Sequence, residues 1–126
     1  MLEGLSEMGE RLKIYVAYRY SADNVLDVLH NIGKAIDVGR QIAELGHSPF
    51  IPHLDCLVAM FDHKNQLPLS YYYNCSIDWM KVADAIFVVD WNDLTTSKGV
   101  AAELEWNKEG KLPVYSKVDQ LPKVNL

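Results

Sequence analysis

The sequence predicts one α/β domain in which helices cover both faces of a central, mostly parallel β-sheet. Its 126 residues, 49% of them hydrophobic and 23% charged, suit a single globular domain that can bury a core of its own. Segments typical of strands and of helices alternate along the chain, as they do in parallel α/β folds. The first strand segment, residues 12–18, is almost continuously apolar, which is typical of a strand covered on both faces.

The first strand and the first helix have the clearest patterns. Residues 12–18 are rich in β-branched and aromatic side chains, which favours a strand. From Val25 onward, apolar residues recur every three or four positions, which predicts one long helix that ends near Leu45. Polar side chains at 21–24 can cap its beginning, and Gly46 stands where a glycine commonly follows a helix.

The rest of the chain continues the alternation. We expect a short strand at 48–51, one or two helical turns at 54–61, a loop at 63–73, a helix at 76–83, a strand at 85–89, a polar loop at 90–98, a helix at 99–109 and a last strand at 112–115. Residues 1–11 should be a polar lead-in and the tail after Lys117 irregular, which leaves a core of about 13–116. The expected architecture is a three-layer sandwich of the Rossmann-like or flavodoxin-like kind, with helices on both faces.

Charge and composition exclude several classes of function. Twelve Lys and Arg against seventeen Asp and Glu give a net charge of −5, which disfavours binding to duplex nucleic acid. No apolar run has the length of a membrane span, and the first residues lack the apolar stretch of a signal peptide. Cys56 and Cys75 have no spacing typical of a zinc site, so we interpret them as free thiols in a reducing cytoplasm.

Ligands of parallel α/β folds bind at the carboxyl ends of the strands, which here lead into loops at 18–23, 52–55 and 90–99. Ser97, Gly99 and Glu103 stand where the last of these loops opens a helix. Ser97 can cap the helix, Gly99 allows a ligand close to the backbone, and the free N–H groups suit a phosphate or carboxylate. Glu103 lies one turn deeper on the same face. A capped helix with an acidic residue in its first turns is the structural alternative.

A second carboxylate and several ring side chains are further candidates. Asp78, in a helix before a buried strand, could pair with Glu103 for glycosyl chemistry, in which one carboxyl attacks the anomeric carbon and the other handles the proton. Solvation on the helix surface is the alternative.

His53 ends the second strand at the ligand-binding edge. The set His47, His53, Asp55 and His63 has no recognised metal-ligand spacing, so we expect no metal. Tyr71, Tyr72 and Tyr73 could stack on a nucleobase, form a subunit contact or pack internally. The dinucleotide and P-loop fingerprints are absent from the sequence.

Four stretches follow one another in order along the chain. They are I-Y-V-A-Y-R-Y-S at 14–21, G-H-S-P-F-I-P-H at 46–53, the block from Asp78 to Val89 that begins D-W-M, and the spacing of Ser97, Gly99 and Glu103 followed by G-K-L-P-V. Taken together, they resemble the nucleoside 2-deoxyribosyltransferase-like superfamily, which includes 2′-deoxynucleoside 5′-phosphate N-hydrolases. Two positions differ from the family pattern. Tyr18 and Arg19 replace a Gly-Pro pair, and alignment to Trp79 places the second catalytic aspartate of the hydrolases at Ser76.

The resemblance implies a function and a set of roles. Glu103 would be the nucleophile that forms a glycosyl–enzyme intermediate from a (deoxy)nucleoside or its 5′-monophosphate, with Asp78 as proton donor and no cofactor. Ser97 and Gly99 would hold the 5′ end of the sugar. Tyr18, Arg19, Tyr20, Ser21 and His53 would line the rest of the substrate site. The family also implies a homo-oligomer, with Trp79, Trp106 and the tyrosine run as contacts. A non-catalytic nucleotide-binding module, or a structural domain with a degenerate pocket, remains the alternative.

Overall fold

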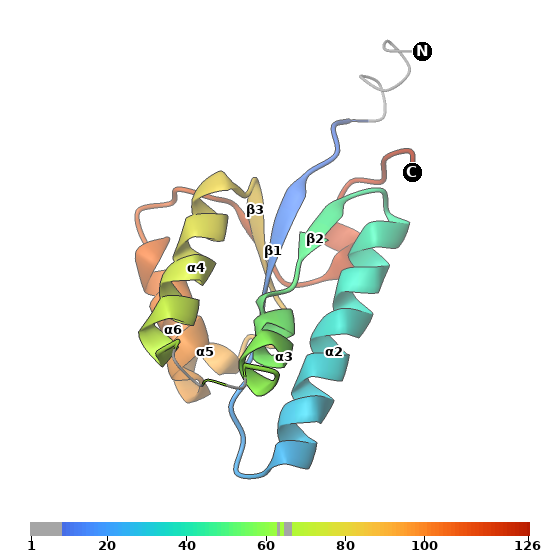
Figure 1. Ribbon diagram of the computed structural model, residues 1–126. Coiled ribbons are helices and arrows are strands. Elements are labelled where there is room, and N and C mark those ends of the chain that lie inside the picture. The colour runs from blue at the N-terminus through green and yellow to red at the C-terminus, as the bar shows by residue number, and fades with distance from the viewer. Residues whose placement is uncertain (1–8, 63, 65–66) are drawn as a thin grey trace.

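The structure is a computed structural model that describes residues 9–62, 64 and 67–126. Within these residues, four parallel strands form one sheet in the order β2-β1-β3-β4 (Figure 1). The strands are β1 (Lys13–Ala17), β2 (Ser48–Phe50), β3 (Ala85–Val88) and β4 (Val114–Tyr115). The predicted α/β fold with a central parallel sheet is therefore confirmed.

Helices cover both faces of this sheet. The long helix α2 (Val25–Glu44) lies on one face, and α4 (Leu69–Val82) and α6 (Lys98–Trp106) lie on the other (Figure 1). The side chains of β1 point alternately to the two layers, since successive residues of a strand face opposite sides. Ile14 and Val16 pack in the core cluster that includes α2, whereas Tyr15 packs in the cluster that includes residues of α4 and α6.

The connections between the strands and the long helices, and the tail after β4, contain shorter elements. They are the 3-10 turn η1 (Pro52–Leu54), the helix α3 (Asp55–Met60), the four-residue helix α5 (Asp93–Thr96) and the 3-10 turn η2 (Val118–Gln120). The predicted long helix from Val25 is confirmed, and Asn24 caps it by accepting a hydrogen bond from the Asp27 N–H. None of the helices in the described ranges is long and apolar enough to cross a membrane.

The prediction of a loop through residue 73 is wrong, because α4 begins at Leu69 and includes all three tyrosines. Pro68 precedes the helix with extended backbone, which suits the entry to a first turn. Met80, near the end of α4, is the residue of this helix that is fully covered. Because the first turns line a cavity instead of the core, they carry no apolar period from which a helix could be predicted.

Two further expectations need correction. The loop predicted at 90–98 contains α5, in which Asp93 is fully buried. The tail predicted as irregular forms η2 and then packs on the domain, with Leu121 and Val124 buried. The N–H of Val124 donates to the carbonyl of Leu45 at 2.8 Å. Gly46 has a φ of +93°, and a Cβ there would lie 2.5 Å from the Val124 carbonyl oxygen, so glycine is needed for both reasons.

Candidate active site

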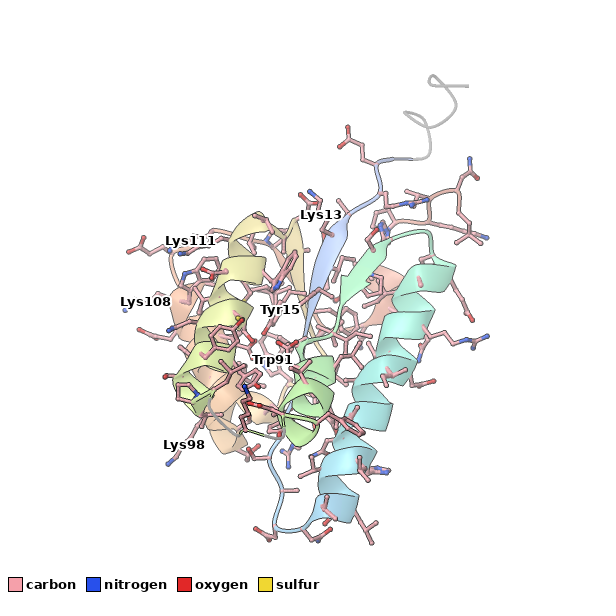
Figure 2. The ribbon with its side chains drawn as sticks, in the orientation of Figure 1. Lys13, Tyr15, Trp91, Lys98, Lys108 and Lys111 are labelled. Atoms are coloured by element: carbon pink, nitrogen blue, oxygen red, sulfur yellow. The ribbon has the colours of Figure 1, made fainter. Side chains whose placement is uncertain are left out.

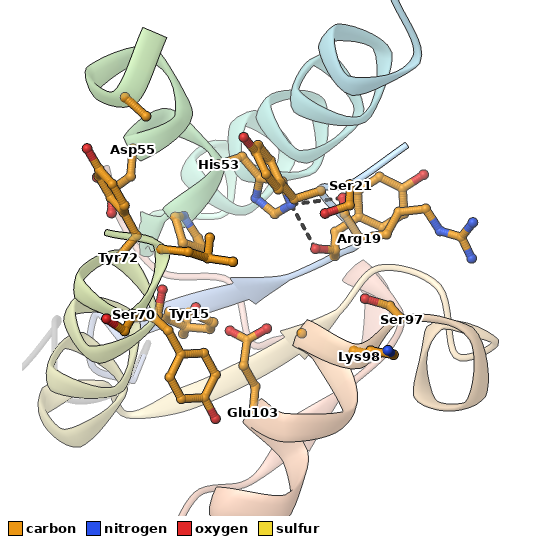
Figure 3. A pocket seen from close by; sticks show the side chains of 18 of the residues that line it. Tyr15, Arg19, Ser21, His53, Asp55, Ser70, Tyr72, Ser97, Lys98 and Glu103 are labelled. Carbon is orange, nitrogen blue, oxygen red and sulfur yellow. Dashed lines mark hydrogen bonds between the residues drawn. The ribbon is translucent and has the colours of Figure 1, made fainter. Parts of the chain in front are cut away.

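One cavity of about 1100 Å³ opens where β1, β2 and β3 lead into their carboxyl-end loops. Its walls come from the β1–α2 loop, from η1 and α3, from the first turns of α4 and from the start of α6 (Figure 3). The lining includes Glu103 and the seven residues predicted to bind substrate, namely Tyr18, Arg19, Tyr20, Ser21, His53, Ser97 and Gly99. Segments far apart in the sequence therefore meet at the predicted edge of the sheet.

Glu103, on the second turn of α6, is the buried carboxyl group of this cavity. The residue is 8% exposed, and its Oε2 has no hydrogen-bond partner among the described residues. Burial raises the pKa of Glu103 to about 7, because removal from water disfavours the charged form. A hydrogen bond from Tyr15 acts in the opposite direction. Near neutral pH, Glu103 is therefore present in both its protonated and its ionised form, and a buried carboxyl group with a perturbed pKa in a cavity is typical of functional sites.

Tyr15 holds Glu103 from the centre of the sheet. Figure 2 labels Tyr15 in the interior of the domain. The residue is 1% exposed, and its ring stacks on Phe50 with 5.8 Å between the ring centroids. The phenol forms side-chain hydrogen bonds with Glu103 and with Ser76 of α4, and burial together with the Glu103 charge raises the Tyr15 pKa. Tyr15 therefore stays a neutral donor and orients the carboxyl group. The prediction missed this residue; a tyrosine within a buried strand was its signal, because a buried hydroxyl needs a partner.

The start of α6 forms one end of the cavity. The side chain of Ser97 caps the helix by accepting a hydrogen bond from the Val100 N–H at 3.3 Å. A Cβ on Gly99 would meet nothing closer than Ser97 Oγ at 4.0 Å, so the space above this backbone is open. Lys98 lies exposed at the rim. Free N–H groups, the positive end of the helix dipole and a nearby ammonium group together suit an anion such as phosphate.

Arg19 lines the cavity but its charge is already neutralised. Its Nε and Nη2 atoms both lie 2.7 Å from Asp93 Oδ1, and Nη2 donates to Thr96 Oγ1 at 2.8 Å. The backbone N–H of Arg19 donates to Asp93 Oδ2 at 2.9 Å. The Arg19–Asp93 pair thus ties the β1–α2 loop to α5, which makes Arg19 a support of the cavity wall. The prediction missed Asp93, because nothing in a polar loop marks one of its aspartates as buried.

His53 fixes the same loop from the other side. Its Nε2 lies 2.8 Å from the Tyr18 carbonyl oxygen and 3.2 Å from that of Arg19, so Nε2 carries the proton and donates (Figure 3). The residue is 4% exposed, and burial lowers the pKa of His53, which keeps the ring neutral. His53 is therefore a positioning residue for the backbone at 18–19.

Asp78 does not share the cavity with Glu103. Its side chain is 73% exposed and its nearest cation is Lys81, with Nζ 3.8 Å from Oδ1. Ser76 lines the cavity instead, and a residue two positions further on a helix points about 200° away. The expectation that Asp78 faces the same bond as Glu103 is therefore wrong. Trp79 is also outside the cavity, 52% exposed and stacked on Phe50 at 5.0 Å.

Metal ligands were not expected, and within the described ranges no three His, Cys, Asp or Glu side chains come together as a metal site would require. His63, one member of the set considered from the sequence, lies outside the described residues. His47 belongs to the opposite end of the sheet, where its Nδ1 accepts from the Leu12 N–H at 3.1 Å. Asp55, by contrast, lines the main cavity together with Tyr72 and Tyr73. Stacking on a nucleobase was one alternative for the tyrosines, whereas Asp55 was considered only as a metal ligand.

Residues 12–117 match the family described as a domain of unknown function, DUF7768. The chain belongs to the DUF7768 family. This match spans the domain from the residue before β1 to beyond β4, and every residue that lines the cavity falls within it. No curated protein matches the chain. The cavity therefore belongs to the DUF7768 domain itself, and its function follows from the chemistry of the residues that line it.

Proposed function

We propose that this DUF7768 protein cleaves or exchanges the N-glycosidic bond of a (deoxy)nucleoside or nucleoside 5′-monophosphate, with Glu103 as nucleophile. The observation that carries the proposal is a carboxyl group that is buried, unpaired at Oε2 and placed beside the open start of a nine-residue helix. The sequence resemblance to the nucleoside 2-deoxyribosyltransferase-like superfamily points to the same residue. The proposal also places the protein in cytoplasmic nucleotide metabolism, without a cofactor.

The sugar would bridge the helix start and Glu103. A 5′-phosphate bound at Ser97 and Gly99 brings the anomeric carbon of the sugar over the carboxylate one turn deeper in α6. Ionised Glu103 then forms a bond to that carbon, the N-glycosidic bond breaks, and its electron pair leaves with the base. The leaving base takes a proton from water in the open cavity. Attack by water on the intermediate completes hydrolysis, whereas attack by a second base completes transfer, and either step restores the carboxylate.

Tyr15 supports this chemistry without touching the substrate. Its hydrogen bond limits the rise of the Glu103 pKa and fixes the direction of the carboxyl group. The ionised fraction available near pH 7 is therefore larger than burial alone would leave. In the second step Glu103 leaves as a carboxylate, and the attacking water gives its proton to solvent in the open cavity.

The test is incubation of the purified protein with ribo- and deoxynucleosides and their 5′-monophosphates, with and without a free acceptor base, followed by chromatography. Glu103→Gln should lower base release by more than about a thousandfold, as loss of a nucleophile does. Glu105→Gln is the matched control, since Glu105 lies on the same helix, is 68% exposed and pairs with Lys108. Base release that persists in Glu103→Gln would refute the assignment of the nucleophile.

A non-catalytic nucleotide-binding module is the second candidate. The observation that favours it is the position of Asp78 on the outside of α4, with Ser76 in the cavity where a second carboxyl group was expected. A binding module predicts a higher melting temperature with nucleotide and no released base. A ligand at a hundred times its Kd would add about 2.7 kcal/mol of stability.

We further propose that the protein assembles as a homo-oligomer through the exposed side of α4. Leu69, which lines the cavity, is 81% exposed, and Trp79, outside the cavity, is 52% exposed, and both are large apolar side chains. Trp106, also considered as a contact, instead packs under Lys111, whose Nζ lies 4.6 Å from the ring centroid. Light scattering during size-exclusion chromatography would give the mass, and a monomer at micromolar concentration would contradict assembly.

A further inference from the structure

The main cavity has two chemically different ends. Ser97 and Lys98 lie at one end, Asp55 and Tyr72 lie at the other, and Glu103 lies between them (Figure 3). A nucleotide whose phosphate binds at the start of α6 and whose anomeric carbon lies over Glu103 therefore extends its base toward the far end. The groups at that end are the ones that can distinguish one base from another.

Asp55 brings a free carboxylate to this far end. It is the first residue of α3 and follows directly on η1, so two consecutive short helices fix its backbone. No hydrogen bond or ion pair joins its side chain to any residue that the structure describes, and its partial burial raises its pKa. Asp55, Tyr15 and Glu103 line the same cavity. Burial raises the pKa of Tyr15 most, and the charges of Glu103 and Asp55 raise it further.

Tyr72 adds a hydroxyl group beside this carboxylate. Both residues line the cavity, and Figure 3 shows them at the same end of it. Burial, and then the charges of Asp62 and Asp55, raise the pKa of Tyr72. The Tyr72 hydroxyl is buried and has no hydrogen-bond partner in the part of the chain that is described. A buried hydroxyl without a partner costs about 1–3 kcal/mol, so a ligand that accepts its hydrogen bond gains that much in return. The far end thus offers two acceptor oxygens and one donor.

The Watson–Crick edges of the bases differ in how they match this set. Guanine presents two adjacent donors, N1–H and the 2-amino group, next to the acceptor O6. Adenine and cytosine place a ring acceptor beside their amino group, and that acceptor would face a carboxylate oxygen. Thymine and uracil present one donor between two acceptors. A carboxylate accepts two parallel donors well, so guanine is the best match to Asp55 and Tyr72 together.

We infer that Asp55 and Tyr72 read the base and select guanine, Asp55 by accepting hydrogen bonds from N1–H and the 2-amino group and Tyr72 by donating to O6. This inference rests on the proposed function, because recognition of the base at Asp55 and Tyr72 assumes that the sugar lies at Glu103. The substrate is then a guanine nucleotide, and both residues determine specificity without taking part in bond cleavage.

The test compares kcat/KM for dGMP with that for dIMP, which lacks the 2-amino group and is otherwise identical. The wild-type protein should prefer dGMP by about tenfold to a hundredfold, the discrimination expected of a good bidentate pair. Asp55→Asn should reduce this preference to about twofold or less. It should also raise activity on dAMP relative to dGMP, because the amide oxygen can accept from the adenine amino group while the amide NH2 donates to the ring nitrogen. Tyr72→Phe should weaken dGMP and dIMP equally, since both carry O6.

Asp37→Asn is the control, because Asp37 is exposed on the outer side of α2 and hydrogen bonds with Gln41. A dGMP-to-dIMP ratio that Asp55→Asn leaves unchanged overturns the inference, as does a wild-type protein that cleaves dTMP as well as dGMP. Melting temperatures of each variant show whether it folds. If no substrate releases base, the proposed function fails. The Kd values for dGMP and dIMP then test, independently of catalysis, whether Asp55 recognises guanine. Equal Kd values, or no binding of either nucleotide, overturn it.

Discussion

Replacing Glu103 with Gln should make the protein more stable, and increasingly so as the pH rises. In the folded protein the pKa of Glu103 is raised to about 7 by burial, against an ordinary value of 4.5. Between these values the unfolded chain has released the proton while the folded protein still holds it. The folded state therefore becomes less favourable as pH rises from about 4.5, and the loss levels off above about 7. Glutamine fills the same space, keeps an acceptor for the Tyr15 phenol and has no charge to bury.

The magnitude follows from the two pKa values. Linkage gives a destabilisation by Glu103 of less than about 1 kcal/mol at pH 5 and about 3 kcal/mol at pH 8. The Gln variant should recover this amount, which corresponds to a rise in melting temperature of roughly 10 °C at pH 8 for a domain of this size. Thermal and urea unfolding of both proteins at pH 5, 6, 7 and 8 measures the difference directly.

The control for this experiment lies on the same helix. Glu105→Gln removes an exposed carboxylate that pairs with Lys108 at 2.9 Å, so it should change stability by only a few tenths of a kcal/mol. The reasoning is refuted if the stability gain of Glu103→Gln is the same at pH 5 as at pH 8, or if the variant is less stable at both. Either result would mean that the Glu103 carboxyl group is well solvated or paired in the folded protein.

Three further predictions follow from the geometry of the site. Base release should fall about tenfold per pH unit below about pH 7 and level off above it, because only ionised Glu103 attacks; initial rates from pH 5 to 9 test this, and a flat profile contradicts it. Arg19→Met should cost about 1–3 kcal/mol in urea unfolding, because Asp93 is left fully buried without its cation, and the double variant with Asp93→Asn should recover part of the loss. Asp78→Asn should keep base release within about twofold of wild type, as expected of a surface residue; a loss of a hundredfold would return Asp78 to the reaction.

Much of the fold could be predicted because it depends on local patterns. The apolar strand at β1 and the regular period of α2 each reflect which side of the element faces the core, so the sequence records them directly. The start of α4 could not be predicted in this way, because its residues line a cavity and so lack a regular apolar period. The helix α5 has only four residues, which is too short for such a period to show. Burial of Asp93 depends on an arginine 74 positions away, and no local pattern contains that information.

In the candidate site, too, the residues that share a local pattern could be predicted, and those brought together by the fold could not. Ser97, Gly99 and Glu103 lie on one helix within seven positions, so their spacing was enough to place them together, as the structure does. Asp78 was misplaced because Ser76 is the residue that faces the cavity, and residues two positions apart on a helix point to nearly opposite sides. The groups that approach Glu103 from other elements could be found only once the chain was folded.

Tyr15 shows why core and site cannot be separated in this fold. Its ring belongs to the buried cluster between the sheet and the helices α4 and α6, and its hydroxyl hydrogen bonds with Glu103. The packing that stabilises the domain therefore also orients the carboxyl group that the proposed reaction uses as nucleophile. Because β1 is an interior strand, flanked by β2 and β3, the backbone at Tyr15 is paired on both sides. A buried carboxyl group that destabilises the folded state is thus held by a hydrogen bond from an interior strand of the sheet.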